Sequence, residues 1–152
     1  MKTNVTYLKH VYTVNENKKT VHCQLQFGIN MNKLPGIDWL DANQQFVDFI
    51  NELIDCGFAK LVYDKNITYL AFNAEGIAHC SPDDDFDASL GKKIASTRAQ
   101  KKSFMIAKNL YDNIYEFFME YAMPYKMMTT KSTESFNKCN SHVKDLIASI
   151  TK

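Results

Sequence analysis

The sequence lacks several features that would assign a chain of this size to a familiar class. Its four cysteines lie far apart and form no CxxC pair, so we expect reduced thiols and no disulfide or metal centre. No apolar stretch approaches the about 20 residues that a membrane helix needs. The first ten residues contain no apolar signal segment either. These absences predict a cytoplasmic protein that does not span a membrane.

The sequence also has no large excess of positive or negative charge. Eighteen basic side chains face seventeen acidic ones, which gives a formal net charge of +1. Such a balance creates no field that would attract nucleic acid or an anionic membrane. Arg98 is the one arginine, and arginine's planar fork is the usual clamp on bases and phosphates. We therefore do not expect extended nucleic-acid readout, and Arg98 becomes a residue of interest.

The composition is that of an ordinary globular protein: of the 152 residues, 45% are apolar and 23% are charged. A chain of this length buries a core without staples, so residues 1–152 are expected to form a single domain. Alternating apolar residues predict a hairpin of strands 4–14 and 19–29. Helical spacing predicts a helix over 38–56, ended by Gly57. Three further strands are expected at 58–63, 67–73 and 76–80.

Two more helices complete the predicted chain. One runs from 88 to 123, where Pro124 stops it, and the other covers 133–150. The first has an aromatic stripe that we expect to be buried, and the second has a narrower apolar face. The predicted order ββαβββαα is α+β, with an antiparallel sheet of about five strands and three helices. The stripe packs either inside one chain or against a second copy, and we favour the homodimer. The first stripe contains Phe104, Ala107, Leu110, Tyr111, Ile114, Phe117, Phe118 and Tyr121; the second face contains Phe136, Cys139, Val143, Leu146, Ile147 and Ile150.

Residues 76–99 read as a strand, an acidic turn and the start of a helix. Pro82 ends the strand because it has no N–H to donate. Four aspartates between 83 and 87 lie where a helix begins, and there carboxylates cap free N–H groups. The same run could bind a hard cation, but it lacks the ligand spacing of a calcium loop. Helix capping is the preferred interpretation, and we expect no metal or cofactor.

The same segment resembles a signature of small phage and prophage proteins of uncharacterised role. The pattern G-x-A-x-C-x-P-x-D-x-F-D-x3-G-x2-[IL]-A-x2-R-A matches from Gly76 to Ala99, over about 24 residues. The resemblance implies a strand–helix arrangement similar to that of double-stranded-RNA-binding domains. Small phage proteins of similar plan include signal-sequestering antagonists of Thoeris-type immunity. The resemblance therefore implies a counter-defence protein and assigns no ligand.

Catalytic interpretations of this segment are incomplete. His79-Cys80-Ser81 has the H-x-S form of two-histidine phosphoesterases, yet no second H-x-[S/T] exists to supply the other imidazole. His79 and Cys80 are neighbours on a strand and point to opposite faces, so one cannot activate the other. We therefore expect a protein that is not an enzyme.

Basic residues on the first turns of the 88–123 helix are typical of a solvated helix face, but they could also receive phosphate groups and form the predicted ligand site. Arg98 is the best candidate for a charge-assisted contact with phosphate, and Phe86 is an aromatic neighbour in the turn. The expected function is sequestration of a nucleotide-derived signal by a phage accessory protein that antagonises host immunity. Two alternatives stay open: an inhibitor that binds a host defence protein such as a nuclease, and a nucleic-acid binder shaped like a double-stranded-RNA-binding domain. The predicted site contains Phe86, Lys92, Lys93, Arg98, Lys101 and Lys102.

Overall fold

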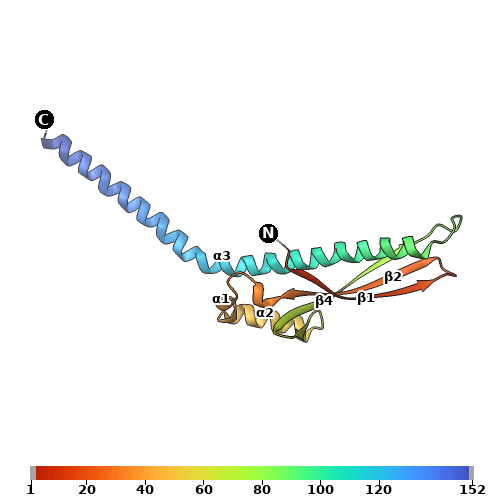
Figure 1. The fold of residues 1–152 in the computed structure, drawn as a ribbon. Helices are drawn as coiled ribbons and strands as arrows, with labels where there is room; N and C mark the ends of the chain where they lie inside the picture. The colour runs from red at the N-terminus through yellow and green to blue at the C-terminus, as the bar shows by residue number, and fades with distance from the viewer. Residues whose placement is uncertain (1–2, 151–152) are drawn as a thin grey trace. The chain divides into compact units, whose positions relative to one another are not determined.

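A computed structural model describes residues 3–150, and it shows an α+β chain with one antiparallel four-stranded sheet. The strand order is β1-β2-β4-β3. The chain divides into two compact units, residues 1–112 and residues 113–152, which are described separately below. All four strands belong to the first unit (Figure 1). The strands are β1 (Val5–Asn15), β2 (Thr20–Asn30), β3 (Lys60–Asp64) and β4 (Ile67–His79).

The predicted N-terminal hairpin is confirmed. β1 and β2 pair antiparallel from Asn15↔Thr20 back to Val5↔Ile29, with one irregularity between Tyr7 and Lys9. The connecting turn places Lys19 at φ 50°, and the side chain of Asn15 accepts a hydrogen bond from the Lys18 amide at 3.0 Å. The alternation predicted for β2 is also found: every second side chain is fully or almost fully buried, namely Val21, Cys23, Leu25, Phe27 and Ile29.

The prediction of five strands is wrong. The segments 67–73 and 76–80 belong to one strand, β4, which pairs with β2 from Thr20↔His79 to Asn30↔Tyr69 without a register shift. Asn73 and Gly76 are residue types that favour turns, which explains why the sequence predicts two strands here. In the structure, Gly76 pairs with Cys23 in the regular ladder. The predicted strands 58–63 and 67–73 are joined by a tight turn between β3 and β4, with Lys65 at φ 54°.

The predicted helix 38–56 is two helices, α1 (Ile37–Asp41) and α2 (Gln44–Asp55), preceded by a short 3-10 turn at Met31–Lys33. Asn43 causes the break. Its backbone is extended (φ −92°, ψ 112°), and its side-chain oxygen accepts a hydrogen bond from the Phe46 amide at 3.0 Å. Asparagine is a strong N-cap residue, so it starts a new helix here. Gly57 follows α2 at φ 77°, as predicted.

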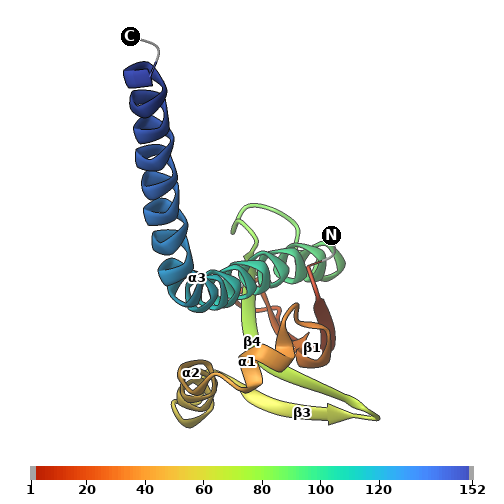
Figure 2. The same ribbon diagram turned by 90° about the vertical axis from the view of Figure 1, so that its left-hand side faces the viewer.

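Helices cover the two faces of the sheet. The Ala88–Asp112 part of α3 (Ala88–Ile150) lies along one face, and α1 and α2 lie on the other side (Figures 1 and 2). The β2 residues that face α3 form a core cluster with small residues of β4 and α3. Beyond α1 and α2, the second face is open, and β4 alternates between buried and exposed residues from 72 to 79. The core cluster contains Val21, Cys23, Leu25, Ala78, Ala95 and Ala99, with Phe86 packed against it.

The prediction that Pro124 ends a helix is also wrong. α3 continues through Pro124 to Ile150, so the expected helices 88–123 and 133–150 are one. Proline removes one backbone hydrogen bond and usually kinks or breaks a helix. The threonines that follow lie within the helix, and their hydroxyls donate to carbonyl oxygens four residues earlier. Thr129 donates to Tyr125 at 3.0 Å, and Thr133 donates to Thr129 at 2.9 Å.

The buried face of α3 differs from the predicted stripe. Ala107, Leu110 and Ile114 are buried as expected, but Phe104 is 44% exposed and Tyr121 is 57% exposed. All residues from 119 to 150 are exposed, so the apolar face predicted for 133–150 is uncovered in the chain. Within residues 3–150, no helix is long and apolar enough to cross a bilayer.

Candidate functional site

The segment that carried the sequence signature is the place where α3 approaches the sheet most closely. A Cβ atom added at Gly76 would lie 2.0 Å from the carbonyl oxygen of Ala95 and 2.6 Å from the amide nitrogen of Ala99. Both are backbone atoms of a helix and cannot move aside as a side chain can. A Cβ at Gly91 would lie 2.6 Å from a methyl group of Val21. The glycines and alanines of the signature therefore allow the helix to pack directly on the strands.

The turn between β4 and α3 is held by groups that bond to backbone carbonyls. The Lys19 ammonium donates to the carbonyl oxygens of Pro82, at 2.9 Å, and Asp84, at 2.6 Å. The Cys80 amide donates to the Lys19 carbonyl at 2.9 Å. The Cys80 thiol lies 3.5–3.8 Å from the carbonyl oxygens of Ser81, Asp84 and Asp85. The thiol is thus engaged as a donor inside the turn.

Asp87 begins α3 as the sequence predicts. Its side-chain oxygen accepts a hydrogen bond from the Leu90 amide at 3.0 Å, and its carbonyl accepts one from the Gly91 amide at 2.9 Å. The side chains of Asp83, Asp84 and Asp85 are exposed. Over residues 3–150, no group of three His, Cys, Asp or Glu side chains is placed to hold a metal ion.

Arg98 lies at the edge of the sheet. β3 pairs with β4 only as far as Ala71, so the rest of β4 has no β3 partner on that side. The Arg98 guanidinium donates a hydrogen bond to the Ile77 carbonyl at 2.5 Å, and so binds β4 in this unpaired stretch. Within the described part of the chain, one of its five N–H donors makes a hydrogen bond, and the side chain is exposed.

The other predicted site residues are not brought together. Lys93 and Arg98, with Ile94 and Thr97, line an open hollow of about 310 Å³ on the outer face of α3. The Lys92 ammonium instead lies 5.7 Å from the centre of the Tyr12 ring on β1, in a cation–π contact. Lys101 and Lys102 are exposed on the following turn, and Phe86 lines a different hollow of about 160 Å³ beneath the acidic turn.

A polar surface that sequence reasoning did not propose as a site lies on the open face of the sheet. His22 of β2 and Glu75 of β4 approach there to 3.4 Å between Nε2 and Oε2. Gln24 pairs with Glu75 in the ladder, and both are exposed. The sequence could have revealed this surface, because strand alternation places His22 and Gln24 on the face of the sheet away from the buried Val21 and Cys23.

Among the described residues, two groups of the first unit have shifted pKa values, the buried Cys23 and the half-buried Tyr111. Burial raises the pKa of the Cys23 thiol, while a hydrogen bond with Tyr12 opposes the rise. Burial also raises the pKa of the Tyr111 hydroxyl, which donates a hydrogen bond to the Thr3 carbonyl. Cys23 is fully buried, so its neutral thiol acts as a small apolar side chain.

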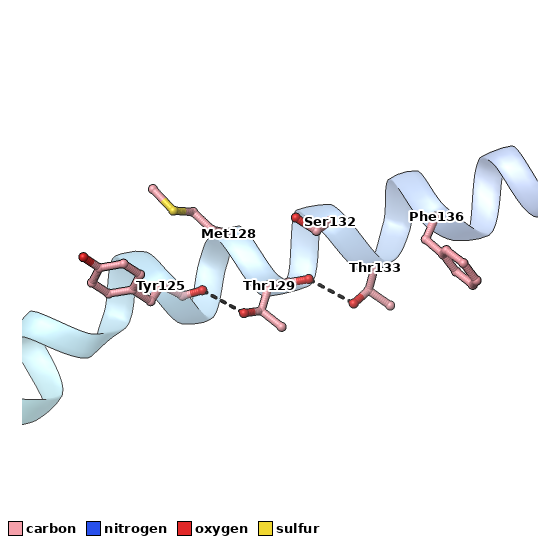
Figure 3. A pocket seen from close by; sticks show the side chains of 6 residues that line it. All are labelled: Tyr125, Met128, Thr129, Ser132, Thr133 and Phe136. Carbon is pink, nitrogen blue, oxygen red and sulfur yellow. Dashed lines mark hydrogen bonds between the residues drawn. The ribbon is translucent and has the colours of Figure 1, made fainter.

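The second unit presents a surface of another kind. Tyr125, Met128 and Phe136 project from α3, with exposed fractions of 62%, 60% and 69%. Together with Ser132 and two threonines they line an open hollow of about 470 Å³ along the helix (Figure 3). The polar groups in this hollow are hydroxyls, whereas those beside Arg98 are cations.

The comparisons with known proteins found no relative. No family model matches the chain, and no curated protein or solved structure matches it either.

Proposed function

We propose that this protein is a non-enzymatic, phage-type accessory protein that antagonises a host process by binding a phosphate-bearing, nucleotide-derived ligand. The supporting observation is the outer face of α3, where Lys93 and Arg98 border one open hollow. Among the described residues, the ion pairs are His22–Glu75 and Lys108–Asp112, so no carboxylate neutralises either cation of the hollow. Unneutralised cations beside a hollow favour an anionic ligand.

Preorganisation supports the role of Arg98. Its hydrogen bond to the Ile77 carbonyl fixes the guanidinium relative to the sheet before any ligand binds. A cation already held in place loses less side-chain entropy when it contacts phosphate. Ile94 supplies an apolar surface between the cations against which a sugar or base can pack. The hollow is shallow and open, so it can contact one part of a ligand and does not enclose it. The site therefore suits the sugar–phosphate part of a nucleotide.

The state of the candidate catalytic groups supports binding over catalysis. A cysteine nucleophile needs a base that takes its proton. The hydrogen-bond acceptors around the Cys80 thiol are carbonyl oxygens of the turn, which are not bases. His79 is exposed at the end of β4.

Isothermal titration tests the proposal. The full chain is titrated with ADP-ribose and a panel of cyclic nucleotides at low salt. We expect heat with at least one nucleotide, and loss of that heat in Lys93→Gln and Arg98→Gln. Lys92→Gln is the matched control, because its ammonium lies over Tyr12 and away from the hollow. The absence of heat with every nucleotide, or equal loss in all three variants, would contradict the proposal.

One observation favours a second function, a protein-binding inhibitor of a host defence effector. The exposed carboxylates of Asp83, Asp84 and Asp85 form no ion pair within the described part of the chain, and such a cluster can imitate nucleic-acid phosphates. A pull-down from host lysate should then yield one stoichiometric protein that is lost when the three residues are changed to asparagine. Retention of that protein by the triple variant would remove this alternative.

A further inference from the structure

The α3 helix of the second unit needs a packing partner. Every residue from 119 to 150 is exposed, including large apolar side chains spread along the helix. An isolated helix has little stability in water, and most helical stability in proteins comes from packing an apolar face. The exposed fractions of the large side chains are 57% for Tyr121, 62% for Tyr125, 60% for Met128, 69% for Phe136, 51% for Val143 and 50% for Leu146.

These side chains recur at helical spacing along one side of the helix, in a set that we call the apolar stripe. Its members lie 4, 7, 11 and 14 positions on either side of Ser132, at about 100° per residue. All of them therefore point within about 40° of the direction of Ser132. The spacing is the same in both directions from Ser132, so the positions of the stripe are unchanged when the helix is reversed. The stripe contains Phe118, Tyr121, Tyr125, Met128, Ser132, Phe136, Cys139, Val143 and Leu146.

We propose that the apolar stripe binds a second copy of this chain as an antiparallel helix pair, with Ser132 on the two-fold axis. A two-fold interface must be self-complementary, because residue i meets residue j and residue j meets residue i. Reversal about Ser132 meets this requirement at every position of the stripe. The proposal concerns a different surface from the anion site and does not depend on it.

The sizes of the facing side chains favour the antiparallel arrangement. Met128 faces the partner's Phe136, Tyr125 faces the partner's Cys139, and Tyr121 faces the partner's Val143. Each tyrosine thus meets a smaller residue, and the small Ser132 lies at the crossing point. A parallel pair in register would place Phe136 against its copy and Cys139 against its copy. That arrangement alternates crowded and empty levels, which interfaces avoid.

The exposed area is sufficient for a stable dimer. Six large side chains that are half to two-thirds exposed offer roughly 600 Å² of mainly apolar surface on each chain. Two such stripes bury about 1,200 Å², which reaches the lower end of stable protein interfaces.

Flanking charges do not decide the arrangement. Glu120 lies level with the partner's Lys144, which is favourable, but Lys126 lies level with the partner's Lys138. All four side chains are exposed at the margins of the stripe, where water and salt screen them. The dimer should therefore show little dependence on salt concentration.

Analytical ultracentrifugation of the full chain tests whether the stripe joins two copies. We expect twice the 17.5 kDa chain mass at tens of micromolar. Phe136→Glu should give the monomer mass, and Asn137→Glu should leave the dimer intact, because Asn137 lies outside the apolar stripe. Circular dichroism checks that both variants keep the fold of the first unit. A monomeric parent chain, or a dimer that survives Phe136→Glu, would overturn the proposal.

Cysteine cross-linking tests the direction of the two helices. In a Cys56→Ser background, Ser132→Cys with Cys139→Ser should form a disulfide dimer under a mild oxidant, because the two sulfurs meet on the axis. Ser141→Cys with Cys139→Ser places the thiol on the opposite face and should not react. Cys139 alone should not cross-link, since the two copies lie about 21 Å apart along an antiparallel pair. Efficient self-cross-linking through Cys139 would indicate a parallel pair and overturn the proposed arrangement.

Discussion

Gly76→Ala places a methyl group where α3 crosses β4 and tests the packing that organises the first unit. The new Cβ would lie 2.0 Å from the Ala95 carbonyl oxygen and 2.6 Å from the Ala99 amide nitrogen. Ordinary contacts of a Cβ begin at about 3.4 Å, so the helix would have to move away by more than an ångström. Separation of the two elements would loosen the core cluster on either side.

The size of the effect follows from opposing contributions. Overpacking a core costs typically 1–3 kcal/mol, and both obstacles here are backbone atoms, so we expect about 3 kcal/mol. Replacing glycine by alanine also lowers the entropy of the unfolded chain, which offsets roughly 0.4–1 kcal/mol. The net loss in the free energy of unfolding is therefore about 2 kcal/mol. With a urea dependence of about 1–3 kcal/mol per molar, the unfolding midpoint should fall by about 0.7–2 M.

Urea denaturation monitored by the fluorescence of Trp39 measures this change. Trp39 is the one tryptophan and lies in α1, so its signal reports the first unit. Asn73→Ala is the matched control, because residue 73 lies on the same strand with its side chain exposed. The control should stay within about 0.5 kcal/mol of the parent. A Gly76→Ala variant as stable as the parent would refute the close packing of α3 on β4.

Three further predictions concern a helix start, a buried thiol and a proline. Asp87→Ala removes the side-chain bond to the Leu90 amide and should lower the free energy of unfolding by about 1 kcal/mol in the same urea assay; an unchanged midpoint would show that the cap is not used. Burial raises the pKa of Cys23, so the folded state favours the neutral thiol. The stability from this group is complete below the unfolded thiol pKa of about 8.5 and is lost as pH rises above it. At pH 8, a thiol reagent should modify the exposed Cys56 quickly and Cys23 only on unfolding, whereas equal rates would contradict the burial of β2. Pro124→Ala restores a missing helix hydrogen bond and should stabilise α3 by up to about 3 kcal/mol. The gain should appear as a higher melting temperature of the helical signal in far-UV circular dichroism. A loss of helix would mean that α3 does not continue through this position.

Patterns that repeat along a single element predicted the first unit well. The period of two in β2 identified all five residues that face α3, because each strand residue alternates sides regardless of its partners. The four aspartates between 83 and 87 were expected to cap a helix from their local chemistry alone, and the structure shows such a cap at Asp87. The α+β class followed from the same periodicities.

The errors arose where a local signal was outweighed by its context. Gly76 marks a turn in many sequences, but here it clears space for a helix that crosses the strand. Asn43 was read as an ordinary helical residue, although its side chain caps a new helix. Pro124 was expected to end a helix that in fact continues. In each case the local propensity amounts to a few kcal/mol at most, which neighbouring structure can outweigh.

The candidate site was located only in part. The sequence singled out Arg98 and the lysines around it, but their directions depend on how α3 is rotated against the sheet. That rotation depends on the close approach of Ala95 and Ala99 to Gly76. The sequence pattern alone does not show that this contact also sets the direction of Arg98. As a result Lys92 faces Tyr12, while Lys93 and Arg98 share one hollow. The contact between Arg98 and the Ile77 carbonyl joins residues 21 positions apart, so no local pattern could predict it.

The most direct test of the proposed function is a nuclear magnetic resonance titration of the isotope-labelled full chain with ADP-ribose and the same cyclic nucleotides. We expect saturable shifts of backbone amides between residues 93 and 102, centred on Lys93 and Arg98, with smaller changes at Ile77. The shifts should weaken with added salt, because the contacts are between exposed charges. Saturable shifts confined to another surface, or none with any nucleotide, would contradict the claim that the outer face of α3 binds a phosphate-bearing ligand.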